Sequence, residues 1–449
     1  MATEDPHKRA VNAEPTKDLF IEMLVRDIGL LPAVIDLVDN SVDGARAVVR
    51  GRASAASGSA GPGTLQGLFL RIRTSRESME LDDNCGGISL DDATNYAFRF
   101  GRVGGKNLER SIGQFGVGMK RAFFKLGGEF TVESVTPTSR FVLPVEVDEW
   151  RDEPGWVFTL REVAEGPQDL GQVGTRIRLA PLLPQVADEV GEPAFATRLL
   201  DEITARHQEA INEGLELSVD DIRAVESPSV LLRGSNIVPA YEEFQMPTAT
   251  DPVRVRIVCG VGESQPGKAG WDVLCNGRTV LRSDQTQATG WGGSGRQFVP
   301  SYHNQFARFR GFAYFDSRDA STVPWTTTKT ALDQDSLIWR AAKQRMVSLM
   351  RPVIDFLNEL DREMDTEAGE TEGPTLSEAV RTAKAVAVAD LTSQAVFRYP
   401  KTSRAPRLGR IAYNRPKPLI EEAKEALDVS TGREVGERTF DYWVDAELG

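Results

Sequence analysis

The clearest pattern of apolar and polar positions lies in residues 32–45, which read PAVIDLVDNSVDGA. Three apolar residues repeat there at helical spacing: Ile35, Val38 and Val42. Three polar residues repeat on the opposite face: Asp36, Asn40 and Asp43. The pattern predicts an amphipathic helix, and Pro32 fits its first turn because a missing N–H costs nothing there. Two carboxylates and an amide on one face suit a hydrated magnesium ion and an attacking water, with an ordinary solvated face as the alternative.

Alternating and β-rich stretches predict strands in two groups. The first group consists of residues 68–73, 130–135, 141–143, 156–160 and 175–179, of which the last four read as consecutive antiparallel strands. The second group consists of residues 253–258, 271–275 and 309–315. Helical patterns at residues 190–215 and 335–350 accompany the second group. Strands mixed with helices in this way predict an α+β chain.

Composition narrows the class of protein. The 449 residues allow two or three domains, and 40% hydrophobic with 27% charged residues is ordinary globular composition. A net charge of −13 argues against non-specific nucleic-acid binding by the whole surface. Three widely spaced cysteines predict neither a disulfide framework nor a zinc site. There is no apolar run of membrane-spanning length and no signal segment, so we expect a cytoplasmic protein without a membrane partner.

A predicted strand end leads into residues 81–88, LDDNCGGI. Asp83 stands where the strand ends and flexible backbone begins. Such a carboxylate can accept a hydrogen bond from an exocyclic amine, and a glycine lets a flat ring approach the main chain. On this segment alone a plain Asp-Asn-Gly turn is the simpler interpretation.

Residues 113–118, GQFGVG, precede an apolar, helix-like run at residues 122–126. Glycine N–H groups ahead of a helix N-terminus form a cradle for phosphates. The segment is not a Walker P-loop, because Met119 stands where that motif needs lysine, and its glycine spacing differs from the dinucleotide fingerprint. A structural glycine turn is the alternative.

These segments, together with Gly174-Thr175, resemble the Bergerat-fold or GHKL ATPases: gyrase, MutL, MORC proteins, the ninety-kilodalton heat-shock chaperones and sensor histidine kinases. The resemblance covers roughly residues 15–185 and rests on four motifs in the family's order. It implies an α/β sandwich with a mixed, mainly antiparallel sheet and helices on one face. The domains expected are a leader at 1–14, an ATP-binding domain at 15–188, a transducer-like α+β domain at 189–365, a linker at 366–378 and a basic tail module at 379–449.

The resemblance also implies roles for individual residues. Asn40 would coordinate magnesium between the phosphates, and Asp83 would bind the adenine amine with support from Thr175. The ATP-binding set implied is Asn40, Asp43, Asp83, Gly87, Ile88, Gly113, Gln114, Phe115, Gly116, Val117, Gly118, Lys120 and Thr175. Asp36 stands in place of the family's usual catalytic glutamate, and its shorter side chain predicts slower hydrolysis. Cys85 replaces the first glycine of the adenine turn, a change expected to alter packing more than chemistry.

The second strand group ends in Trp325-Thr326-Thr327-Thr328-Lys329-Thr330 and resembles the transducer domain of MutL, gyrase and MORC ATPases. There a lysine reaches the γ-phosphate, and Lys329 is the candidate for that role. A lysine that pairs with triphosphate and loses its partner after hydrolysis would link domain orientation to the nucleotide. A solvated loop lysine is the alternative.

The tail has a local basic segment. Residues 394–418 contain no acidic residue, and Phe397, Tyr399 and Tyr413 lie among the basic ones. Basic residues can neutralise phosphates and aromatic residues can stack on bases, so this segment predicts a DNA contact. The candidate DNA-binding residues are Arg404, Arg407, Arg410 and Arg415. Strand-like residues 410–414 and helix-like residues 418–427 and 433–446 follow the order of a ribbon-helix-helix module. A plain structural or dimerising tail is the alternative.

The function predicted is a magnesium-dependent ATPase in which ATP drives a conformational or dimerisation switch. The expected partners are a second copy of the chain and DNA, in DNA maintenance or defence. A non-hydrolysing ATP-binding switch is the main alternative, since Asp36 is short. A histidine kinase needs a phosphoacceptor, and only His7 precedes the domain. A chaperone needs client-binding and dimerising domains for which the chain has no room.

Overall fold

The computed structural model describes residues 15–55, 64–101, 112, 117–166, 170–293, 299–326, 328–364, 375–400 and 413–447. The chain divides into two compact units. The first consists of Met1–Ala368 and Pro374–Lys401, and the second of Gly369–Gly373 and Thr402–Gly449. No helix in these ranges is long and apolar enough to cross a membrane.

The first unit contains a sheet whose eight described strands have the order β5-β4-β3-β6-β2-β1-β7-β8. The strands are β1 (Phe69–Thr74), β2 (Met79–Asp83), β3 (Glu129–Val135), β4 (Ser139–Glu146), β5 (Arg161–Glu165), β6 (Gly174–Leu179), β7 (Glu216–Val219) and β8 (Ile222–Arg223). Only β1 and β7 run parallel, so the mainly antiparallel α+β architecture is confirmed. Strands on both sides of the expected domain boundary at residue 188 belong to this one sheet.

One strand prediction is wrong. Residues 157–160 form no strand, and β5 begins only at Arg161. Trp156 and Phe158 nevertheless pack edge-on or tilted against Phe100 and Trp150. Alternation of apolar residues indicates which side chains face the interior, but it does not show that the backbone pairs with a strand. Here the inward-facing side chains pack in an aromatic cluster instead.

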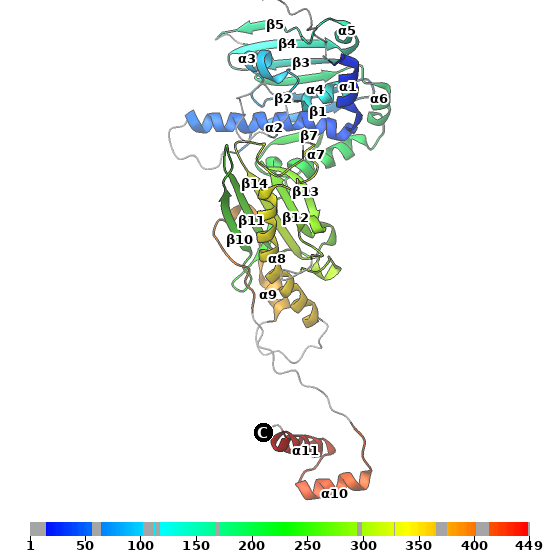
Figure 1. Cartoon of the computed structure of the whole chain (residues 1–449), viewed down its shortest axis with the longest axis vertical. Coiled ribbons are helices and arrows are strands. Elements are labelled where there is room, and N and C mark those ends of the chain that lie inside the picture. The colour runs from blue at the N-terminus through cyan, green and yellow to red at the C-terminus, as the bar shows by residue number, and fades with distance from the viewer. Residues whose placement is uncertain are drawn as a thin grey trace, which may run out of the picture. The chain divides into compact units, whose positions relative to one another are not determined.

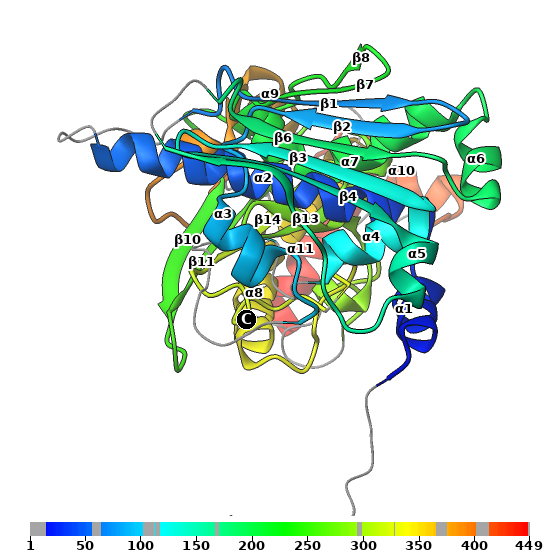
Figure 2. The same cartoon turned by 90° about the horizontal axis from the view of Figure 1, so that it is seen from above.

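The helices around this sheet are α1 (Lys17–Arg26), α2 (Leu30–Ala55), α3 (Leu90–Asp92), α4 (Gly118–Leu126), α5 (Val147–Asp152), α6 (Pro184–Val190) and α7 (Phe195–Asn212). Helix α2 contains the predicted amphipathic pattern and runs along one face of the sheet (Figures 1 and 2). Its apolar stripe of Ile35, Val38 and Val42 is buried, as predicted. Helices α4 and α7 pack against α2, so this helix is covered on more than one side.

A second sheet in the same unit has the order β10-β11-β14-β12-β13. Its strands are β10 (Ala240–Met246), β11 (Val253–Val261), β12 (Gly270–Cys275), β13 (Arg278–Asp284) and β14 (Phe309–Asp316). The long helix α8 (Leu337–Met364) packs on β11 and β14. The strand pair β9 (Val230–Arg233) and β15 (Lys384–Ala387), with the short helix α9 (Leu376–Thr382), completes this part of the unit.

Charged groups join α2 and α7 to the second sheet. Arg46 on α2 donates to the backbone carbonyl of Asn276, in the turn between β12 and β13. Its guanidinium also lies 3.9 Å from a carboxylate oxygen of Glu209 and 3.8 Å from one of Glu213, both at the end of α7. One arginine therefore ties three elements together.

Glu209 predicts a pH dependence of folding stability. Burial raises the pKa of its carboxyl to about 7, because Arg46 offsets burial only in part. A folded-state pKa above the ordinary 4.5 means that the folded protein binds more protons, so the free energy of unfolding falls as the pH rises from 4.5 through 7. Glu209→Gln should remove most of this fall and stabilise the protein by about 1 kcal/mol at pH 8. Thermal unfolding at pH 5 and pH 8 measures the change in stability, and Glu216→Gln, at an exposed position, is the control. Equal stability of the Glu209→Gln variant and wild type at pH 8 would contradict the prediction.

The described part of the second unit is a helical pair, α10 (Lys417–Leu427) and α11 (Gly432–Glu447). A capping box starts α11, because the Glu434 N–H donates to the Thr431 hydroxyl and the Thr431 N–H donates to the Glu434 carboxylate. Both helices were predicted. Residues 413–416 form no strand, and residues 410–412 lie outside the described ranges, so the strand of a ribbon-helix-helix module is absent from the described residues of this segment.

Candidate functional site

The polar face of α2 is not solvated throughout, because its first residue, Asp36, is buried. Asp36 is only 5% exposed, and its Oδ2 accepts a hydrogen bond of 2.5 Å from Nη2 of Arg121 on α4. Gly118, the first residue of α4, lies so close that a Cβ atom there would stand 3.2 Å from the Asp36 carboxyl group. Asn40, one turn later, is exposed. The polar face of α2 thus presents the buried carboxylate of Asp36, next to the N-terminus of α4, and the exposed amide of Asn40.

Asp83 ends β2 and is held by three donors. Its Oδ2 accepts from the Ser41 hydroxyl at 2.6 Å, and its Oδ1 accepts from the backbone N–H groups of Cys85 at 2.9 Å and Thr175 at 3.2 Å. Burial raises the pKa of this carboxyl, although the three hydrogen bonds oppose that rise. Asp83 and Thr175 also face each other in the β2–β6 register, so the structure brings together the two residues expected to bind adenine.

Two glycines allow close packing around the turn after Asp83. A Cβ atom on Gly44 of α2 would stand 2.5 Å from the Cys85 carbonyl oxygen, so only glycine lets α2 lie against the turn. Gly87 has φ +71°, and a Cβ atom there would stand 2.2 Å from the Val135 carbonyl oxygen. The next residue, Ile88, is fixed by its N–H, which donates to Ser134 Oγ at 2.6 Å.

Cys85, the second residue after Asp83 in this turn, is 3% exposed. Burial raises the pKa of its thiol, with Asp83 adding to the rise. A buried, protonated thiol packs as a small apolar side chain.

The structure describes the predicted phosphate cradle, residues 113–118, only in part. Gly113, Gln114, Phe115 and Gly116 lie outside the described residues. On their N-terminal side both oxygens of Asp43 accept from the Ile112 N–H at 2.7 Å, so α2 anchors the start of the segment. On the other side Val117 precedes α4, which begins at Gly118.

Lys120 has a partner inside the protein. Its side chain is 2% exposed, and its Nζ donates to the Ala97 carbonyl at 2.8 Å. Burial lowers the pKa of the ammonium to about 8. In this structure Lys120 therefore does not join the polar face of α2.

Lys329 comes from the loop after β14 and reaches α2. Its Nζ donates to Asp39 Oδ2 at 2.7 Å and lies 3.8 Å from Asp36 Oδ1. The residue is 6% exposed and has φ +55°, a left-handed conformation that is unusual for a side chain of this size. The second sheet thus contributes an ammonium beside the carboxylate proposed to activate water.

Five residues of this neighbourhood were missed by reasoning from the sequence: Asp39, Ser41, Arg121, His207 and Arg278. A signal existed for Asp39, because it stands four residues after Ile35 within the apolar stripe of the helix, where a charge needs a partner. Ser41 follows the metal-ligand candidate directly. The remaining three carry no local signal, since their partners lie far away in the chain.

The basic segment of the tail differs from what its composition predicts. Phe397 is buried against Phe356 of α8, and the Tyr399 hydroxyl donates to Glu359 at 3.2 Å. These two rings are therefore used in packing. Arg404, Arg407 and Arg410 lie outside the described residues, whereas Arg415 lies over the exposed Tyr413 ring, 5.3 Å from its centre.

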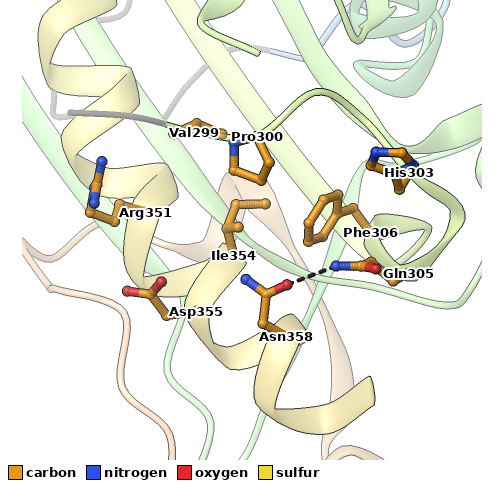
Figure 3. A pocket seen from close by; sticks show the side chains of 9 residues that line it. All are labelled: Val299, Pro300, His303, Gln305, Phe306, Arg351, Ile354, Asp355 and Asn358. Atoms are coloured by element: carbon orange, nitrogen blue, oxygen red, sulfur yellow. Dashed lines mark hydrogen bonds between the residues drawn. The ribbon is translucent and has the colours of Figure 1, made fainter. Parts of the chain in front are cut away.

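A cavity of about 330 Å³ lies between α8 and the segment before β14. Figure 3 shows polar side chains around it, including His303, Arg351 and Asp355, and the hydrogen bond of 2.7 Å that Gln305 donates to Asn358. None of the residues predicted to bind nucleotide lines it.

Comparison with known proteins identifies one part of the chain. Residues 28–170 match the family described as histidine kinase-, DNA gyrase B- and HSP90-like ATPases. No curated protein matches the chain. The matched segment includes α2, the Asp83 turn and the glycine segment at 113–118, so the resemblance stated from these motifs is confirmed.

Proposed function

We propose that this chain, which carries a GHKL-type ATPase domain over residues 28–170, is a magnesium-dependent ATPase whose bound nucleotide controls the second sheet through Lys329. The observation that carries the proposal is the reach of Lys329 from the loop after β14 to Asp36 on α2. A γ-phosphate next to Asp36 would lie within reach of that ammonium. Loss of the phosphate would remove the attraction and release the second sheet.

Each proposed role has support in the geometry. Asp83, fixed by three donors, is a preorganised acceptor for the exocyclic amine of adenine. The exposed amide of Asn40 fits a magnesium ion, which keeps several waters and is held largely by substrate phosphates. When bound, that ion would neutralise phosphate charge. Asp36 would accept a proton from the attacking water.

One observation favours the non-hydrolysing switch as second candidate. Arg121 donates to Asp36 Oδ2 at 2.5 Å, so that oxygen is already occupied and is not available to an attacking water. Hydrolysis then requires that Arg121 move toward the phosphates and leave Asp36 free. If Arg121 stays, ATP is bound and sensed but not cleaved.

Asn40→Ala tests the nucleotide site. We expect the variant to bind ATP at least tenfold more weakly than wild type with magnesium, because an oxygen ligand of the ion is lost. In the presence of a chelator the two affinities should agree within twofold. Calorimetric titration with a non-hydrolysable ATP analogue measures both, and Asn358→Ala on α8 is the matched control. Equal affinities in magnesium would contradict the proposal.

ATP-driven dimerisation and a DNA contact by the basic tail are proposed from the sequence. If both hold, the mass in solution should double when a non-hydrolysable ATP analogue is added, and a DNA duplex should co-elute with the dimer. Light scattering after size-exclusion chromatography measures these masses. An unchanged mass with saturating analogue would contradict the dimerisation switch.

A further inference from the structure

A buried group of four charged or polar side chains lies where α2 meets the second sheet. Asp39 is fully buried, and its Oδ2 accepts from Lys329 at 2.7 Å and also from Arg278 of β13. His207 of α7 is fully buried, and its Nε2 lies 3.2 Å from Asp39 Oδ1. We call these four residues the Asp39 cluster.

The Asp39 cluster draws its members from separate elements. Asp39 belongs to α2, immediately before Asn40, whereas Arg278 and Lys329 lie 239 and 290 residues further along the chain. His207 stands at a kink of α7, where its φ of −120° and ψ of 21° leave the helical range. Contacts of this kind form only when α2, α7 and the second sheet are packed together.

Charge in the Asp39 cluster is not balanced one to one. Asp39 carries one negative charge, while Lys329 and Arg278 both bind its Oδ2. A fully buried carboxylate needs such partners, because a buried charge without a counter-charge is strongly destabilising. His207 supplies no negative charge, and burial lowers the pKa of its imidazole. Asp39 alone therefore does not balance the two cations, and Asp36 Oδ1, 3.8 Å from the Lys329 ammonium, supplies a second carboxylate.

We propose that Asp39 is the positioning residue for Lys329: it holds the ammonium beside Asp36 before nucleotide binds, and Arg278 keeps Asp39 paired when Lys329 turns to the γ-phosphate. This inference rests on the proposed function. It adds two residues to the proposed function, Asp39 on α2 and Arg278 on β13, and both act only through Lys329.

The geometry supports this division of roles. Lys329 is 2.7 Å from Asp39 and 3.8 Å from Asp36, so its ammonium lies between an anchoring carboxylate and the site of chemistry. Without an anchor, a long lysine side chain loses rotamer freedom when it binds phosphate, and that loss weakens binding. Arg278 is 3% exposed, so its guanidinium lies in the interior beside Asp39. Because Arg278 stays, Lys329 can move without leaving a buried carboxylate unpaired.

The test compares affinities for ADP and for a non-hydrolysable ATP analogue, with magnesium, in the full chain. Asp39→Asn and Lys329→Ala should each reduce the preference for the analogue by at least tenfold and leave ADP affinity within twofold of wild type. The double variant should show no further reduction, because both changes remove one interaction. Asp272→Asn, which changes a half-buried carboxylate of the second sheet, is the matched control and should keep the full preference.

Asp39→Asn with an unchanged preference, or a double variant whose losses add, would overturn the proposal. A structural role alone would lower ADP affinity and the unfolding temperature together and would not separate the two nucleotides. Should Asp39→Asn fail to fold, Asp39→Asn with Arg278→Gln keeps the net charge of the cluster and should show the same selective loss. A wild-type chain that binds neither nucleotide would instead overturn the proposed function.

Discussion

Asp83→Asn should weaken ATP binding by about 100-fold, the largest affinity change that we expect from one substitution. The carboxylate would accept a hydrogen bond from the adenine amine, and a hydrogen bond to a charged group contributes about 1.5–3 kcal/mol. An asparagine presents an amide N–H₂ group in place of one acceptor oxygen. It also loses one of the acceptors that now serve Ser41, Cys85 and Thr175.

Base selectivity separates this role from a purely structural one. Calorimetric titration with non-hydrolysable ATP and GTP analogues should show that Asp83→Asn loses most of the preference for adenine, whereas a general loosening of the turn would weaken both alike. Asp82→Asn is the matched control, because Asp82 pairs with Arg176 at the surface, 3.3 Å away. An Asp83→Asn protein with wild-type ATP affinity would remove Asp83 from the site.

The sequence was sufficient for the parts of the site that are local in the chain. The pattern of α2 and the Asp83 turn each depend on residues within about ten positions, where spacing determines which side chains meet. The meeting of Asp83 with Thr175 also follows the expected motif order, although 92 residues separate them. Short-range pattern and ordered motifs were therefore enough to predict that Asp83 and Thr175 meet.

The sequence was not sufficient where burial has a tertiary cause. Asp36 reads as a solvated helix position, but α4 covers it and Arg121 pairs with it. Asp39 has three neighbours, which come from α7, β13 and the loop after β14. No periodic pattern in the sequence predicts contacts between residues so far apart in the chain. The same limit explains residues 157–160, where apolar alternation reflects an aromatic cluster rather than a strand.

The shared sheet changes how the two predicted domains are related. Strands β7 and β8 follow α7 in the chain but extend the first sheet beside β1. Helix α7 therefore contacts its own sheet through β7 and the second sheet through β13. Because His207 and Glu209 lie on this helix, α7 offers a second connection between α2 and the second sheet, beside the direct contact made by Lys329 in the proposed switch.

Asp36→Asn should lower ATP turnover by 100-fold to 10,000-fold while ATP affinity stays within threefold of wild type. A general base contributes roughly that factor, and an amide cannot accept the proton of an attacking water. Asn retains the shape of Asp36 beside Gly118, so the site should still close around nucleotide. Phosphate release under saturating ATP measures turnover, and titration with a non-hydrolysable analogue measures affinity.

Asp36→Glu is the matched control for this last prediction, because it keeps a carboxylate and restores the reach of the family's usual glutamate. Its turnover should equal or exceed that of wild type, since the longer side chain can reach past the Arg121 pair. Equal turnover in Asp36→Asn and wild type would show that Asp36 is not the base. Tight ATP binding by wild type with no phosphate release, together with release by Asp36→Glu, would identify the chain as an ATP-sensing switch in which one missing methylene prevents hydrolysis.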